Sequence, residues 1–277
     1  MYSELAGKVV IVTGAGRPKG IGCATATRFA AEGASVVVVD LPTSSSQVGN
    51  VIGISPKLDH VYQAIKASGG DCMAYQADVS DPQQVEQLVD TVVSKYSRVD
   101  VMVCNAAITH DHGLDIKTLT ETVFSQVLAV NLTGTFLCAQ AAARHMIENA
   151  NKGTIVTIGS RASRRGNPNI IAYSASKFGV LGMSQSLALA LAPHGIRVNC
   201  VCPGSVDTDM ADAEIEIAHK KTGINEDKLK QMAIDSVPLG RLTSPEDLAN
   251  TIVWLASSQS NHLTGQAINV NGGSWLS

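Results

Sequence analysis

Short β-branched runs alternate with longer helical patterns along most of the chain, and this alternation restricts the fold more than any other feature. Strands are predicted at 8–12, 35–39, 72–76, 99–103, 153–158, 196–201 and 267–270. Helical patterns lie between them, near 20–32, 57–68, 82–96, 118–149, 172–192 and 245–256. Apolar strands separated by helices are typical of a parallel sheet that is covered on both faces. We therefore expect an α/β fold with a doubly wound parallel sheet.

No repeat or linker interrupts this order, and 277 residues suit one large domain, 1–277. Two helix starts are marked by a capping residue before proline, at Asp81-Pro82 and Ser244-Pro245. Two segments exceed the connections of about 2–6 residues that such folds need. Residues 41–56 form a long Ser- and Gly-containing connection of open role, and 205–240 form a partly helical excursion. We expect the second to be a substrate lid, because long loops beyond parallel strands usually cover a ligand crevice.

Charge and composition favour a small-molecule partner. The chain has 21 basic and 24 acidic residues, a net charge of −3, and no basic stripe that would suggest nucleic acid. Its start lacks the pattern of a signal peptide, and we find no apolar run near the roughly 18 residues of a membrane span. We expect a soluble cytoplasmic protein. The six cysteines include no C-x-x-C pair, which favours reduced core thiols over disulfides or zinc.

A glycine-rich stretch, "TGAGRPKGIG" at 13–22, follows the first predicted strand. It fits neither common phosphate-binding motif, because Lys19 replaces the third glycine of G-x-G-x-x-G and Ile21 replaces the lysine of the Walker motif. A strand, glycines and a helix in this order nevertheless aim helix N-terminal amides at a phosphate. The stretch is a candidate phosphate loop with unusual spacing.

A second motif, "YSASK", places Tyr173 and Lys177 one helical turn apart, thirteen residues beyond Ser160 at a predicted strand end. A nearby ammonium group can lower the pKa of a phenol, ordinarily about 10, and so make it a better acid or base. Alone, the motif is more often a surface pair on an amphipathic helix. Its context favours a catalytic function.

In that context the chain resembles the single-domain branch of the short-chain dehydrogenase/reductase family over nearly its whole length. The matching motifs occur in family order: "VTGAGRPKGIG", Asp40 after "VVVV", Asp78-Val79, "CNAA" at 104–107, "VNLTG" around Asn131, Ser160, "YSASK", "RVNCVCPGSVDT" from Arg197, and "LTGQAINVNGG". The resemblance implies a Rossmann-type sheet of seven parallel strands that binds a nicotinamide dinucleotide. The glycine loop then resembles T-G-x-x-x-G-x-G with two extra residues between Gly14 and Gly20.

The resemblance also implies roles for individual residues. Tyr173 would be the general acid/base, and Lys177 would lower its pKa and hold the nicotinamide ribose. Ser160 would orient the substrate oxygen, and Asn131 would hold a water molecule that relays protons. The other implied cofactor contacts are Gly14, Gly20, Ile21, Gly22, Asp40, Leu41, Asp78, Val79, Asn105, Ala106, Pro203, Gly204, Val206 and Thr208, with Tyr173 and Lys177 contributing too. Ala107 departs from the glycine that is usual in the family's third motif.

Asp40 favours NAD over NADP, because a carboxylate there can bond both hydroxyls of the adenosine ribose and would repel a 2′-phosphate. Leu41 supplies no phosphate partner. Arg17 and Lys19, inside the glycine loop, favour NADP instead, because either could reach a 2′-phosphate. We expect an NAD-dependent enzyme that interconverts a secondary alcohol and a ketone; an NADP-dependent carbonyl reductase and a non-catalytic nucleotide sensor are the alternatives.

Several further expectations are less specific. His110 and His112 lack a third ligand at metal-site spacing, so we expect no metal. Arg161, Arg164 and Arg165 could attract an anion but are more often solvated. Helices 118–149 and 172–192 are apolar on more than one face and pair subunits in the family, which favours a homodimer or homotetramer. We also hypothesise that residues 41–56 pack against the two-residue insertion around the adenosine. The substrate stays open among sugar alcohols, aryl ketones, steroids and acyl ketones.

Overall fold

The computed structural model describes residues 2–42 and 55–276. Its strands are β1 (Val9–Thr13), β2 (Ser35–Asp40), β3 (Cys72–Gln76), β4 (Val101–Cys104), β5 (Thr154–Ile158), β6 (Arg197–Pro203) and β7 (Ala267–Val270). Its α-helices are α1 (Ile21–Ala31), α2 (Pro56–Ala67), α3 (Pro82–Tyr96), α4 (Glu121–Leu128), α5 (Thr135–Glu148), α6 (Ile171–Leu191), α7 (Asp209–Thr222), α8 (Glu226–Asp235) and α9 (Pro245–Ala256). Each expected strand is present within three residues of its predicted bounds.

The strands form one parallel sheet in the order β3-β2-β1-β4-β5-β6-β7. The chain reverses direction across the sheet after β3, when it returns to place β4 beside β1. The connections after β1 and β4 therefore leave in opposite directions, which opens a crevice at the carboxyl ends of these two strands. The predicted fold class, a Rossmann-type doubly wound sheet of seven strands, is confirmed.

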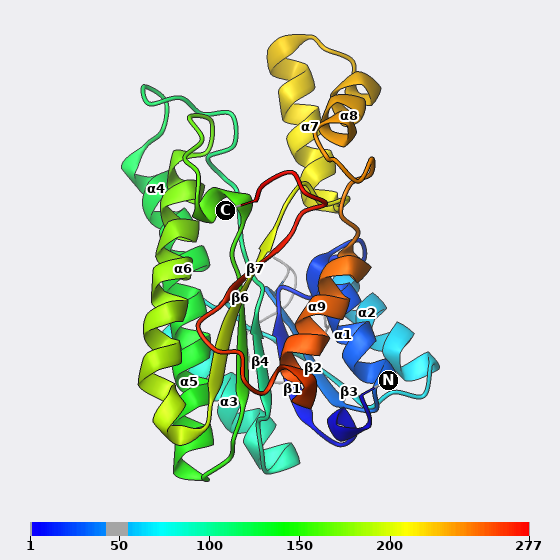
Figure 1. Cartoon of the computed structure of the whole chain (residues 1–277), viewed down its shortest axis with the longest axis vertical. Coiled ribbons are helices and arrows are strands. Elements are labelled where there is room, and N and C mark those ends of the chain that lie inside the picture. Colours follow the sequence, from blue (N-terminus) through cyan, green and yellow to red (C-terminus); the bar gives the residue numbers. More distant parts are fainter. Residues whose placement is uncertain (1, 43–54, 277) are drawn as a thin grey trace.

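Helices cover both faces of the sheet, because alternate side chains of each strand point to opposite faces (Figure 1). On one face, strand residues such as Ile11 and Met102 pack with side chains of α3, α5 and α6. On the other, Val10 and Val36 pack with α1, α2 and α9. Both caps predicted from proline-preceded residues are present, since Asp81 and Ser244 accept backbone hydrogen bonds from the first turns of α3 and α9.

The helix predicted at 118–149 differs from the structure. Thr120 caps α4, so the helix begins at Glu121, and a π-helical turn (Ala129–Gly134) separates α4 from α5. Such a turn inserts one residue into the helix and is frequent at functional sites. By length and mean hydropathy, 1.4, Glu121–Glu148 could also span a membrane, which the sequence analysis did not foresee. Core helices pass the same test, and Cys138, Ala142 and Met146 lie in the core here.

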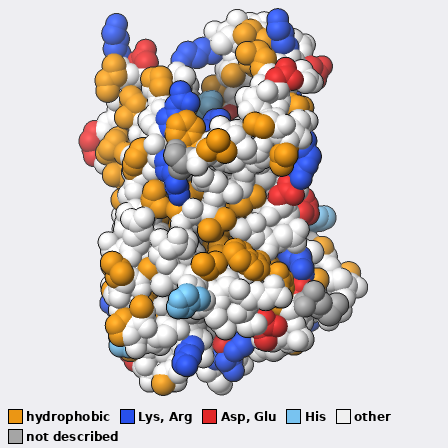
Figure 2. All heavy atoms as spheres, in the orientation of Figure 1, with side chains coloured by type: hydrophobic (Ala, Val, Ile, Leu, Met, Phe, Trp, Pro, Cys, Tyr) orange, Lys and Arg blue, Asp and Glu red, His pale blue; other side chains and the backbone are white. Residues whose placement is uncertain are grey.

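The excursion at 205–240 is more regular than expected, because it contains the helices α7 and α8. Both helices stand beyond the carboxyl ends of the strands, at the top of Figure 1. The surface is hollowed at this end of the molecule (Figure 2). Most of the 41–56 connection, and with it the hypothesis that it packs on the glycine loop, lies outside the described residues.

All six cysteines are free thiols and five are buried, as expected of core residues. Cys200 and Cys202 share one face of β6, with their Sγ atoms 3.9 Å apart.

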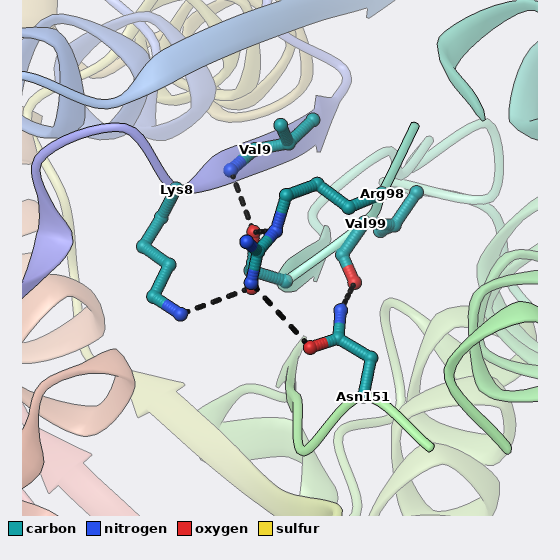
Figure 3. Close-up of polar contacts among 6 residues, drawn as sticks. Lys8, Val9, Arg98, Val99 and Asn151 are labelled. Atoms are coloured by element: carbon teal, nitrogen blue, oxygen red, sulfur yellow. Dashed lines mark hydrogen bonds and ion pairs between the residues drawn. The ribbon is translucent and has the colours of Figure 1, made fainter. Parts of the chain in front are cut away.

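At the amino ends of the strands, the buried carboxylate of Asp100 holds the central strands β1 and β4 together. Figure 3 shows Lys8, Val9 and Arg98, the three partners of this carboxylate. The carboxylate accepts hydrogen bonds from the Val9 N–H at 2.9 Å and from Arg98 Nε at 2.7 Å, and pairs with Lys8 Nζ at 3.2 Å. Burial alone would raise the pKa of Asp100, but the bonds from Arg98 and Val9 and the charge of Lys8 outweigh it and hold the pKa below its usual value. These contacts join the starts of β1 and β4.

We expect Asp100→Ala to lower the free energy of unfolding by about 2–3 kcal/mol, because the Val9 amide and two cations lose their acceptor. Since the folded pKa is depressed, this contribution is complete above the unfolded pKa of about 4 and is lost as the pH falls through the folded value. Urea unfolding of the wild type and of Asp100→Ala, at pH 7 and below pH 4, measures the difference in the free energy of unfolding. Glu86→Ala, which breaks an exposed pair with Arg144, is the control and should cost less than about 1 kcal/mol. An equal loss in the two variants at pH 7 would contradict this account.

Candidate active site

A cavity of about 780 Å³ opens at the carboxyl ends of the strands, between the sheet and α7. Nearly all of the residues that the family resemblance singles out line it, although they come from connections scattered along the chain. Two do not reach its surface: Gly22 and Asn131. The predicted residues that line it are Gly14, Gly20, Ile21, Asp40, Leu41, Asp78, Val79, Asn105, Ala106, Ser160, Tyr173, Lys177, Pro203, Gly204, Val206 and Thr208.

The glycine loop packs closely against the end of β4 and the start of α1 only because its glycines lack side chains. Gly14 has φ +67°, and a Cβ there would lie 2.7 Å from Ala106 Cα. A Cβ on Gly22 would lie 2.4 Å from the carbonyl oxygen of Gly14, so this glycine lets α1 pack under the loop. Gly20 precedes α1 without a side-chain cap, which leaves the first-turn amides available to an anion. These features fit the pyrophosphate of a dinucleotide.

Other candidate cofactor residues are fixed by hydrogen bonds around this loop. The Asn105 side chain donates to the carbonyl oxygens of Thr13 and Gly14, at 2.9 and 3.0 Å. Asp78 accepts from the Ser80 amide at 2.9 Å and from the Ser80 hydroxyl at 2.6 Å. The Asn105 bonds tie the glycine loop to the end of β4, and the Ser80 bonds fix the Asp78 carboxylate in the turn after β3.

Asp40, at the end of β2, is directed into the cavity by two backbone amides. Its Oδ2 accepts from the Gly16 N–H at 2.6 Å, and its Oδ1 accepts from the Leu41 N–H at 2.8 Å. A Cβ on Gly16 would lie 2.7 Å from Asp40 Oδ2, so only glycine allows this approach. The sequence analysis missed the role of Gly16, although its place inside the glycine loop was a signal.

The two cations of the inserted loop lie in different surroundings. Lys19 Nζ pairs with Asp207 at 2.9 Å and with Asp212 of α7 at 3.2 Å, so its charge links the glycine loop to the segment 207–212. Hydrogen bonding to Asp207 raises the pKa of Lys19. Arg17 lines the cavity.

Ser160 and Tyr173 both line the cavity, and their side chains interact. The backbone of Ser160 is extended beyond β5, and its hydroxyl oxygen accepts from the Ala162 N–H at 3.0 Å, which leaves the hydroxyl proton free to be donated. Burial raises the pKa of Tyr173 to about 12, the interaction with the Ser160 side chain opposes that rise, and the charges of Glu214 and Asp111 add to it. The phenol is therefore protonated at neutral pH.

Lys177 lies one turn further along α6, with its amine almost completely buried. Nζ donates to the Ile158 carbonyl oxygen at 2.7 Å and lies 5.5 Å from the centre of the Tyr173 ring. Burial lowers the pKa of Lys177 to about 8. From the sequence, this ammonium was expected to lower the pKa of Tyr173. In the structure the burial of the phenol prevails, so the pKa of Tyr173 is raised.

Asn131 lies in the π-helical turn, fully buried behind the cavity wall. Its Oδ1 accepts from the Ile108 N–H at 2.8 Å, and its Nδ2 donates to the Ile108 carbonyl oxygen at 3.0 Å and to Ser176 Oγ at 3.1 Å. Ser176 in turn donates to the Tyr173 carbonyl oxygen at 2.7 Å. Asn131 thus joins the segment after β4 to the first turns of α6, which carry Tyr173. The predicted water relay stays a prediction.

Two acidic residues near Tyr173 were not predicted as site residues from the sequence. Asp111 is buried, and its Oδ2 accepts the Tyr173 N–H at 3.0 Å in the first turn of α6. Glu214 of α7 lines the cavity and acts electrostatically on the phenol. The only signals in the sequence were the polar "THDHG" segment and the position of Glu214 in the expected lid.

The histidines and arginines divide between the cavity and the surface. His112, Arg161 and Arg165 line the cavity, whereas His110 is exposed and Arg164 donates to the Ala267 carbonyl oxygen at 3.0 Å. Within the described ranges, no group of three or more candidate ligands could hold a metal ion.

Known proteins resemble the chain over almost all of its length. The family model described as "Enoyl-(Acyl carrier protein) reductase" matches residues 14–274. A short-chain dehydrogenase/reductase of Armillaria gallica is 38% identical over 267 residues, which cover 96% of this chain and 95% of that protein. A 3-oxoacyl-[acyl-carrier-protein] reductase of Staphylococcus aureus is 37% identical over 269 residues, 97% of this chain and 98% of that protein.

Among solved structures, an NAD⁺-bound xylitol dehydrogenase superposes with a TM-score of 0.87 at 29% identity, covering 98% of this chain and 100% of that one. The sheet order, the glycine loop and the motifs of the cavity agree with these matches. The chain belongs to the short-chain dehydrogenase/reductase family of oxidoreductases.

Proposed function

We propose that this oxidoreductase transfers hydride between NAD and a secondary alcohol or ketone, with Tyr173 as the general acid/base. The observation that carries the proposal is the convergence of Ser160, Tyr173 and Lys177 in the same cavity as the glycine loop and Asp40. Once bound, the nicotinamide supplies the hydride chemistry. The protein supplies the orientation and the proton.

In ketone reduction, the protonated phenol of Tyr173 gives its proton to the carbonyl oxygen, and the Ser160 hydroxyl donates a hydrogen bond to the same oxygen. In alcohol oxidation the phenolate accepts that proton. The Lys177 amine is held by the Ile158 carbonyl oxygen, 5.5 Å from the centre of the Tyr173 ring. When this amine is protonated, its positive charge stabilises the phenolate. We propose that Lys177 also bonds the nicotinamide ribose.

The environment of Asp40 supports NAD as the cofactor. Its carboxylate lines the cavity, and a negative charge there would repel the 2′-phosphate of NADP. Lys19, the cation that could compensate, pairs with Asp207 and Asp212 instead. Arg17 in the cavity is the observation that favours the second candidate, an NADP-dependent carbonyl reductase.

A screen of secondary alcohols with NAD, and of ketones with NADH, tests the proposal through the absorbance of the reduced nicotinamide. We expect turnover of at least one alcohol–ketone pair in both directions. Tight NADH binding with no turnover across a broad panel would instead support the nucleotide sensor.

The pKa of Tyr173 sets an expected pH dependence. Because the phenol is protonated well above neutral pH, kcat/KM for ketone reduction should change little between pH 6 and 8. Alcohol oxidation needs the deprotonated phenol, so its kcat/KM should rise by up to about tenfold per pH unit over the same range. Initial rates in a buffer series of constant ionic strength measure both. An oxidation rate that falls as the pH rises would contradict the role of Tyr173.

We propose further that the chain forms a homodimer or homotetramer through α5 and α6. Phe136, Phe178 and Leu189 on these helices are 38%, 46% and 79% exposed, which leaves apolar surface for a second subunit. Light scattering coupled to gel filtration should give two or four times the 28.9 kDa chain mass. A monomer at micromolar concentration would contradict this.

A further inference from the structure

Two polar side chains at the substrate end of the cavity have no role in the proposed hydride and proton transfer. Glu214 projects from α7, and His112 comes from the connection after β4. Both line the cavity, and His112 Nδ1 lies 3.9 Å from a carboxylate oxygen of Glu214. Glu214 also lies close enough to the phenol for its charge to raise the pKa of Tyr173. The pair therefore lies on the wall of the same cavity as Tyr173, with Glu214 within electrostatic range of the phenol.

Neither side chain has a hydrogen-bond partner among the described residues. The separation of 3.9 Å is too long for a direct hydrogen bond, and His112 Nδ1 is buried without one. No hydrogen bond reaches the Glu214 carboxylate either. Its burial raises the pKa of Glu214. Buried polar atoms such as His112 Nδ1 are normally paired, and because both side chains stay partly exposed to the cavity, a bound ligand can supply the missing partner.

The geometry suits a hydroxyl group. An oxygen atom about 2.8 Å from each partner fits between two atoms 3.9 Å apart. A hydroxyl can donate its proton to the carboxylate and accept the imidazole N–H, whereas a ketone oxygen or an ether can only accept.

The surrounding charges favour a neutral substrate. The Glu214 carboxylate would repel a carboxylate or phosphate placed beside it. Arg161 lines the same cavity, but its charge acts on Glu214, so the two charges oppose each other and leave no net positive site for an anion. Arg165 lies over the Trp275 ring, 5.4 Å from its centre. The nearby lid residues Met210 and Ile215 supply only apolar contacts.

We propose that Glu214 and His112 together bind a second hydroxyl group next to the one that is oxidised, so that the substrate is a neutral vicinal diol or longer polyol. This inference rests on the proposed function and specifies its substrate class. Glu214 and His112 are then specificity-determining residues, and a substrate without the second hydroxyl leaves both of them unpaired.

Butane-2,3-diol and butan-2-ol form a matched pair of probes, because they differ in the second hydroxyl alone. With NAD we expect kcat/KM to favour the diol by roughly 10–100-fold. Glu214→Ala and His112→Ala should each bring the ratio towards one, and Glu214→Gln should keep part of the preference. Glu216→Ala, two residues along α7 on an exposed carboxylate paired with Lys220, should keep all of it.

Binding separates this inference from the proposed function. In Tyr173→Phe with NAD present, saturation-transfer NMR should detect the diol more strongly than butan-2-ol, and Glu214→Ala in that background should remove the difference. If the diol binds selectively but the wild type turns over no alcohol, the proposed function is contradicted and the hydroxyl site is still supported. Equal binding of the two probes, or a preference unchanged in Glu214→Ala, would overturn the inference.

Discussion

Tyr173→Phe is expected to lower kcat by roughly 10²–10⁴-fold, the contribution typical of general acid–base catalysis. The substitution removes the phenolic oxygen that meets Ser160 and keeps the ring that packs in the cavity wall. The dissociation constant of NADH, from a fluorescence titration, should therefore stay within about threefold of the wild type. Loss of turnover with NADH binding intact is the combined result that the mechanism requires.

Tyr75→Phe is the matched control, because Tyr75 lies on β3 and packs against the core away from the cavity. It should leave kcat unchanged. Substantial residual turnover in Tyr173→Phe, within tenfold of wild type, would show that another group moves the proton.

Asp40→Ser is expected to reverse or abolish the preference for NADH over NADPH. The wild type should have a higher kcat/KM with NADH, and the variant should lose about 10–100-fold with NADH, the worth of a charge-assisted hydrogen bond to the ribose. Activity with NADPH should rise, because the charge that repels the 2′-phosphate is gone. The ratio of the two kcat/KM values measures the change.

Two further variants separate charge from local structure. Asp40→Asn keeps an acceptor for one of the two backbone amides, Gly16 or Leu41, while it removes the charge, so it should also raise activity with NADPH. Asp59→Ala, on the exposed surface of α2, should leave the ratio unchanged. A wild-type enzyme that prefers NADPH would show that Arg17 outweighs Asp40.

Local sequence patterns sufficed to predict the sheet, because its central strands β1, β4 and β5 are buried on both faces and therefore continuously apolar. They failed at the π-helical turn around Asn131, where the apolar period continues through an inserted residue. They also failed to define α7 and α8, because neither helix has a fully buried residue and neither shows the apolar stripe of a core helix.

The candidate site was predictable where the family motifs carry it, but its long-range contacts were not. Asp111 reaches Tyr173 across 62 positions, and Lys19 reaches Asp212 across 193. Nothing in the spacing of Tyr173 and Lys177 reveals how deeply they are buried, and burial decides both pKa values. The location in the cytoplasm and the extent of the single domain stay predictions.

Isotope transfer tests the central claim most directly. A secondary alcohol deuterated at its carbinol carbon is incubated with the enzyme and NAD, and the nicotinamide product is analysed by mass spectrometry and NMR. The account predicts one deuterium on the reduced nicotinamide ring with the wild type and a strongly diminished rate of labelling with Tyr173→Phe. Label retained on the alcohol by the wild type, across a panel that includes vicinal diols, would contradict it.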